Sequence, residues 1–273
     1  MKRVVFLTFA DYKYRESLYR LKNQVSQSKY ITDIYIFTEK DLGKDFRRNF
    51  HPWLYRRGYG YWKWKSYLVQ KVLDNIDEGD ILIYSDAGCV FNKSADDRLL
   101  YYIDKVRTSK SGLLVFAQNL IEKDWTKSDC FDYFGVIKEK KITDTPQTLG
   151  GIFFICKNDI SQKIVEKWVT VTMDHYDLIT DKRSQIPNFD SFVEHRHDQS
   201  ILSILAKIYK AETIPSSEMD KNNFDMIPIQ PKRLKQKNIY ASIKGKCLIP
   251  FRYCIGLYLK YFKQFYFKNR IAW

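Results

Sequence analysis

The 273-residue sequence lacks any apolar run of the roughly 18 or more residues that a membrane-spanning helix needs. It also lacks a recognisable leader, because the apolar N-terminal stretch runs directly into Asp11 and Lys13 without a small-residue cleavage site. We therefore expect neither a spanning helix nor a signal peptide, and we predict a cytoplasmic location.

Cysteine is sparse and shows no pairing pattern. The five cysteines form no Cys-x-x-Cys pair and lie mostly beside apolar residues. An odd number without metal-ligand spacing argues against both a disulfide framework and a zinc site. We expect reduced thiols in the core at Cys89, Cys130, Cys156, Cys247 and Cys254.

Acidic residues are absent from the C-terminal segment. From Lys232 to Trp273 there are eleven Lys and Arg and no Asp or Glu, so the net charge of +14 leaves +3 for residues 1–231 (14 minus 11). A nearly neutral body with a basic, aromatic tail is typical of a protein that binds an anionic membrane surface. We predict a membrane-associating segment over residues 232–273, with a helix packed on the domain as the alternative.

Short apolar runs alternate with stretches of helical period along the rest of the chain. Strands are expected at 4–9, 34–37, 81–84, 113–117 and 151–155, and helices at 18–25, 67–76, 161–176 and 200–209. Near-continuous apolar strands separated by helices indicate a doubly wound α/β fold with a mostly parallel central sheet flanked by helices. Asp198 is the expected N-cap of the last helix.

Asp86 directly follows the apolar strand 81–84, in the stretch Tyr-Ser-Asp-Ala-Gly-Cys. Ligands of open α/β sheets bind outside the carboxyl ends of strands, which is where this carboxylate is expected. The small residues Ala87 and Gly88 leave room for a phosphate or a sugar ring. A simple turn carboxylate is the alternative for this motif taken alone.

Three segments together carry a resemblance to a known family. They are Gly-Tyr-Gly-Tyr-Trp-Lys-Trp-Lys at 58–65, Tyr-Ser-Asp-Ala-Gly-Cys at 84–89 and His-Arg-His-Asp-Gln-Ser at 195–200. Their order and spacing over roughly residues 1–210 resemble bacterial glycosyltransferases of the GT-A type that act in capsular polysaccharide and lipopolysaccharide O-antigen synthesis. The resemblance implies a catalytic GT-A domain over 1–231.

The resemblance also implies an activity and its partners. A hexosyl group would move from a nucleotide sugar, most simply a UDP-sugar such as UDP-galactose, to a glycan acceptor. A lipid-linked acceptor would place the enzyme peripherally on the inner face of the cell membrane, consistent with the basic C-terminal segment.

A divalent cation, Mn²⁺ or Mg²⁺, is a further expectation from the resemblance. In the enzymes that this chain resembles, a strand-end Asp-x-Asp binds a cation that bridges the donor phosphates. Asp86 is then the candidate metal ligand. However, Gly88 occupies the second Asp position and no histidine follows His197, so a fixed ammonium of Lys63 or Lys65 is the alternative.

The resemblance assigns donor-binding residues to several strand ends and loops. Trp62 or Trp64 is instead expected to fill the core. The expected donor-binding residues are Thr8, Phe9, Ala10, Lys65, Ser85, Asp86, Ala87, Gly88, Gly150 and Gly151.

Catalytic and acceptor-binding residues are expected on the C-terminal side of the domain. Asp198 is the candidate catalytic residue, with helix capping as its alternative role. A solvated loop is the alternative for the segment 122–129. The expected acceptor-binding residues are Trp125, Asp129, His197 and Gln199.

Two other functional classes fit parts of the sequence. A basic protein could bind nucleic acid, but the nearly neutral body argues against this, and we predict no nucleic-acid partner. A catalytically inactive, membrane-attached scaffold is the second alternative, since the second Asp is missing.

Overall fold

The computed structural model describes residues 2–48, 50 and 57–234. The predicted membrane-associating segment therefore lies outside the described residues, apart from residues 232–234. No helix within the described ranges has both the length and the apolar character to cross a membrane.

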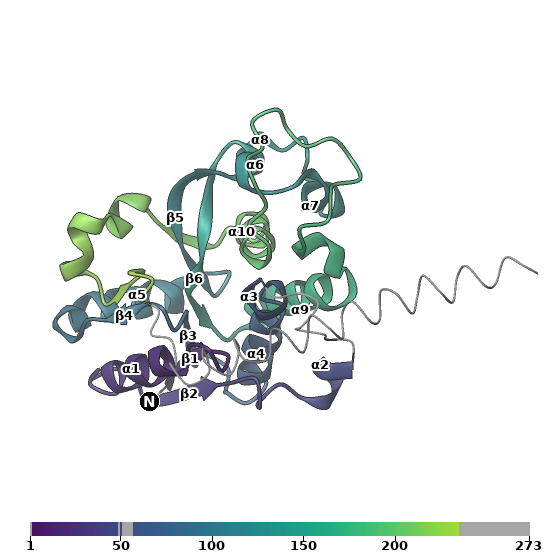
Figure 1. Cartoon of the computed structure of the whole chain (residues 1–273). Coiled ribbons are helices and arrows are strands. Elements are labelled where there is room, and N and C mark those ends of the chain that lie inside the picture. The colour runs from purple at the N-terminus through teal and green to yellow at the C-terminus, as the bar shows by residue number, and fades with distance from the viewer. Residues whose placement is uncertain (1, 49, 51–56, 235–273) are drawn as a thin grey trace, which may run out of the picture.

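A six-stranded sheet forms the centre of the described part of the chain, in the order β2-β1-β3-β6-β5-β7 (Figure 1). Its strands are β1 (Val4–Phe9), β2 (Asp33–Phe37), β3 (Ile81–Ser85), β5 (Leu113–Ile121), β6 (Pro146–Cys156) and β7 (Glu212–Ile214). A smaller antiparallel pair joins β4 (Val90–Phe91) to β8 (Ile229–Gln230). The predicted α/β class is confirmed.

Strand direction differs from a purely parallel sheet at one position. β1 pairs in parallel with β2 and β3, and β5 pairs in parallel with β7. β6 runs antiparallel to both of its neighbours, β3 and β5. An apolar run looks the same in either direction, so the direction of β6 was not available from its residues.

Helices cover both faces of this sheet. The longer helices are α1 (Arg15–Val25), α4 (Trp64–Leu73), α5 (Asp96–Thr108), α9 (Asp159–Asp174) and α10 (Asp198–Ile208). The shorter helical segments are α2 (Lys44–Arg48), α3 (Gly58–Tyr61), η1 (Lys93–Ala95), α6 (Glu122–Trp125), α7 (Ser128–Tyr133), α8 (Lys140–Thr143), η2 (Tyr176–Ile179), η3 (Ser216–Met219) and η4 (Lys221–Met226).

Successive strand residues point to opposite cores. In β1, Val5 and Leu7 belong to the core that packs against α4, α9 and α10, whereas Val4 and Phe6 belong to the core formed with α1 and α5. Both faces of the sheet are therefore buried, which explains why the strands read as continuous apolar runs.

Some predicted element boundaries were wrong. β6 begins at Pro146, five residues before the predicted start of the strand at 151. The N-cap of α10 is His197, and Asp198 is the first residue of the helix. The prediction that Asp198 is the N-cap was therefore wrong, because its carboxylate is paired with Lys65 instead. Cys89, Cys130 and Cys156 are buried free thiols, as predicted.

Candidate active site

Asp86 lies just beyond the carboxyl end of β3, where it meets β6. Its backbone N–H donates to the carbonyl of Gly151 (2.9 Å), and its Oδ1 accepts from the hydroxyl of Tyr84 (2.7 Å). A Cβ added to Gly151 would lie 2.8 Å from Asp86 Oδ2, so a larger residue would displace this carboxylate. The Asp86 side chain is still 42% exposed, and a ligand can reach it.

The Lys65 side chain lies between Asp86 and the first residue of α10, Asp198. Its ammonium lies 2.9 Å from Asp198 Oδ2 and 3.7 Å from Asp86 Oδ1, and it donates to the Gly150 carbonyl at 2.8 Å. We refer to Tyr84, Asp86, Lys65, Gly150 and Asp198 as the Asp86 cluster. Four elements that are distant in sequence, β3, α4, β6 and α10, contribute to it.

Burial controls the ionisation of the Lys65–Asp198 pair. Burial alone would lower the pKa of Lys65, but the two carboxylates outweigh it and raise that pKa, so the ammonium stays charged at neutral pH. Burial raises the pKa of Asp198 to about 6, against the opposing effect of Lys65. At neutral pH the pair is therefore ionised.

The segment 58–62 approaches the Asp86 cluster through an unusual left-handed turn. Its five residues all have positive φ, from 52° to 89°. Such a turn costs about 1–2 kcal/mol for each non-glycine residue, so the surroundings must hold it in place. At Gly60 a Cβ would lie 2.1 Å from the Phe50 ring, and the Trp64 indole N–H closes the turn by donating to the Gly58 carbonyl (3.0 Å).

The turn joins the 58–65 motif to the 195–200 motif. The Trp62 ring stacks on the His197 ring at 5.4 Å, and the Tyr61 hydroxyl donates to Asp181 (2.8 Å). His197 also has a positive φ of 59° and lies 2.8 Å, through Nδ1, from the Ile179 carbonyl. Burial lowers the pKa of His197 to about 4, so the ring is neutral. The predicted acceptor contact of His197 is not supported, because this ring is almost fully buried.

Gln199 and Gly150 adjoin the cluster on the β6 side. A Cβ at Gly150 would lie 2.7 Å from the Cβ of Gln199, so these two residues are in close contact. The Gln199 amide donates to Oε1 of Gln147 (2.7 Å), and the Gln147 amide donates to the buried Glu122 (2.9 Å). A buried polar network therefore orients Gln199 beside the cluster.

Trp125 lies next to the same network. The Arg196 guanidinium covers its ring at 4.3 Å, and its carbonyl accepts from the hydroxyl of Ser200 at 3.0 Å. Since Trp125 and Arg196 are only half-buried, a ligand can reach this stacked pair. The predicted acceptor-binding residues Trp125 and Gln199 thus both lie near the N-terminus of α10.

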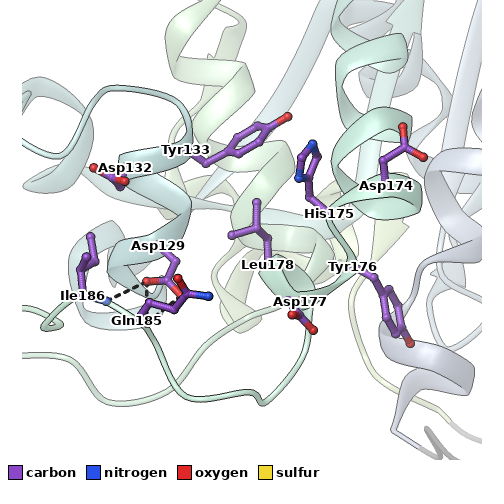
Figure 2. A pocket seen from close by; sticks show the side chains of 10 residues that line it. All are labelled: Asp129, Asp132, Tyr133, Asp174, His175, Tyr176, Asp177, Leu178, Gln185 and Ile186. Carbon is purple, nitrogen blue, oxygen red and sulfur yellow. Dashed lines mark hydrogen bonds between the residues drawn. The ribbon is translucent and has the colours of Figure 1, made fainter.

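Asp129 lies at a different place, in an open pocket of about 520 Å³. Its carboxylate accepts the backbone N–H groups of Gln185 and Ile186 at 2.9 to 3.2 Å (Figure 2). Tyr133 and His175 also line this pocket. No described residue that lines this pocket belongs to the Asp86 cluster. Asp129 therefore holds the 185–186 loop, and the structure does not bring it to Asp86.

The end of β1 lies beside the 58–65 segment. Thr8 is fully buried, and the Phe9 ring stacks on the Trp64 ring at 3.9 Å. The Ala10 N–H donates to the Phe37 carbonyl at 3.2 Å. All three predicted donor-binding residues of this strand are thus buried, and the Phe9 side chain supports Trp64 rather than facing solvent.

Several residues that contact the loop 86–89, which we call the Asp86 loop, were missed by sequence reasoning. The Arg20 guanidinium donates to the carbonyls of Ala87 (2.9 Å) and Cys89 (2.7 Å). The Leu234 N–H donates to the Gly88 carbonyl (2.8 Å), which ties the start of the C-terminal segment to this loop. Only Tyr84 had a sequence signal, since it lies two residues before Asp86 and faces the same side of the strand.

The residues near Asp86 do not fit a metal held by the protein. Within the described ranges, no group of three His, Cys, Asp or Glu side chains is placed to bind an ion. Asp86 Oδ1 already accepts from Tyr84, and the Asp198 carboxylate is buried against Lys65. The Lys65 ammonium would also repel a second cation at this short range.

No protein-family model matches the chain, and no curated protein matches its sequence. Among solved structures, it is similar to a glycosyltransferase involved in the glycosylation of the major capsid of PBCV-1 (10% identity, 80% of this chain and 83% of that chain, TM-score 0.46). It is also similar to the glycosyltransferase GlyE of Streptococcus pneumoniae TIGR4 (13% identity, 78% of this chain and 45% of that chain, TM-score 0.40). A third similar structure is mouse xyloside xylosyltransferase 1 (11% identity, 79% of this chain and 85% of that chain, TM-score 0.40). These likenesses are distant.

Proposed function

We propose that this chain is a glycosyltransferase that moves a hexosyl group from a UDP-sugar, such as UDP-galactose, to the hydroxyl of a glycan acceptor. The observation that carries the proposal is the meeting of four elements at Asp86. An exposed carboxylate at a strand end, beside a glycine and held by a buried ammonium, is suited to accept hydrogen bonds from the sugar hydroxyls of a nucleotide sugar.

In the proposed reaction, the bond between the anomeric carbon and the diphosphate oxygen breaks, and the nucleoside diphosphate leaves with the electron pair. A new bond forms to the acceptor oxygen, whose proton passes to a base or to solvent. Asp86 contacts the donor. Asp198 is a positioning residue in this scheme, because it is buried and reaches Asp86 only through Lys65.

We expect nucleotide sugars to bind the native protein and raise its melting temperature. The measurement is a thermal-shift panel of UDP-galactose, UDP-glucose and a purine nucleotide sugar, followed by detection of released UDP on addition of glycan acceptors. Equal shifts with all three ligands, or none, would contradict a UDP-sugar site. The absence of any shift would favour the inactive scaffold instead.

We further propose that the acceptor is lipid-linked and that the basic segment 232–273 binds the inner face of the cell membrane. Its eleven basic residues support this, as does the contact between Leu234 and Gly88, which starts the segment at the Asp86 loop. The full chain should sediment with anionic vesicles and remain soluble with neutral ones. A chain ending at residue 238 that still sediments would refute the role of this segment.

A further inference from the structure

The Lys65 ammonium lies in a cage of oxygen atoms. The Gly150 carbonyl is 2.8 Å from Nζ, Asp198 Oδ2 is 2.9 Å away and Asp86 Oδ1 is 3.7 Å away. One carbonyl and two carboxylates are the ligands that hard divalent cations prefer. A cation bound by these atoms would lie close to the position of Nζ. The ammonium therefore occupies the place that a metal would need.

The cage is closed around this side chain. Lys65 is 2% exposed and Asp198 is 3% exposed, so solvent reaches neither. The Tyr84 ring covers the ammonium from the sheet side, with its centroid 5.1 Å from Nζ. Lys65 is also fixed at its base, in the first turn of α4. A buried ammonium with two carboxylates and a ring face around it is a tethered cation that cannot exchange with solvent.

Packing does not require a glycine at position 88, where the second carboxylate is missing. Its φ is not in the left-handed region, and a Cβ there would lie 3.5 Å from the Arg233 Cα, an ordinary contact. An Asp would fit the backbone at this position. The chain has instead a glycine at 88 and a cation already in place at 65.

We propose that Lys65 replaces the divalent cation of this site, so that the chain binds a nucleoside-diphosphate sugar without a metal held by the protein. This inference rests on the proposed glycosyl transfer for its ligand. Lys65 crosslinks the carboxylates from β3 and α10 and offsets one of their two negative charges, which is the structural part of what a bound cation would do.

Titration of the protein alone with MnCl₂, followed by electron paramagnetic resonance of free Mn²⁺, tests the inference without any nucleotide. The wild-type protein should show no stoichiometric Mn²⁺ binding. Lys65→Met opens the oxygen cage and should bind Mn²⁺ more than about tenfold more tightly, because a unit charge within 4 Å is removed. Stoichiometric binding by the wild-type protein would overturn the proposal.

Lys65→Met places two carboxylates together without a counter-charge and could fail to fold, so Gly88→Asp is the second variant. It supplies an additional carboxylate and leaves Lys65 in place. Because the ammonium still fills the cage, this variant should gain no more than weak Mn²⁺ binding. Tight binding by Gly88→Asp would show that Lys65 does not exclude the metal.

The thermal shift with UDP-galactose separates this inference from the proposed function. We expect the same shift in a chelator and in MnCl₂. A shift that requires MnCl₂ would refute the metal-free site but support the UDP-sugar ligand. No shift in either buffer would refute the UDP-sugar ligand, and the Mn²⁺ titration would still decide whether Lys65 excludes a metal.

Discussion

Asp86→Asn should lower kcat/KM for glycosyl transfer by about 100-fold or more, since it removes the one exposed charge of the cluster that a donor can contact. The amide keeps nearly the same shape and can still accept from the Tyr84 hydroxyl. Lys65 also keeps its nearest carboxylate, that of Asp198. The measurement is steady-state transfer from UDP-galactose, together with the melting temperature.

A matched control is Asp104→Asn on α5, which removes a carboxylate that is 58% exposed from a helix on the opposite face of the sheet. It should leave both activity and melting temperature unchanged. If Asp86→Asn retained activity within about threefold of the wild type, a difference of less than one kcal/mol, Asp86 would have no role in binding the donor.

The largest effect on stability is expected at the Lys65–Asp198 pair. Asp198→Asn leaves a buried ammonium without its nearest carboxylate and should lower the free energy of unfolding by about 3–5 kcal/mol. The double variant Lys65→Met with Asp198→Asn should lose clearly less than the sum of the two single variants, because neither charge is then left alone. Denaturant unfolding of all four proteins gives the coupling energy.

The pair Lys207–Glu122 provides a comparison. Its atoms are 2.7 Å apart and Glu122 is fully buried, so Glu122→Gln should also destabilise the protein. Additive losses at Lys65 and Asp198 would mean that their contact contributes little to stability.

The sequence by itself determined the layered architecture and the position of Asp86. The apolar runs are long and rich in β-formers because both faces of the sheet are buried, so β1 and β3 were predicted close to their observed bounds. Asp86 was predictable for the same reason, since an acidic residue that ends a buried strand must lie at the edge of the sheet.

The tertiary structure alone decided what surrounds Asp86. Lys65 and Asp198 are 133 residues apart, and neither helical period nor motif spacing indicates that their side chains meet in a buried ion pair. The left-handed turn at 58–62 is likewise set by distant contacts, such as Trp62 with His197. Local sequence specifies strands and helices through period and propensity, whereas a buried charge pair depends on the packing of elements whose order in space is fixed only when the sheet forms.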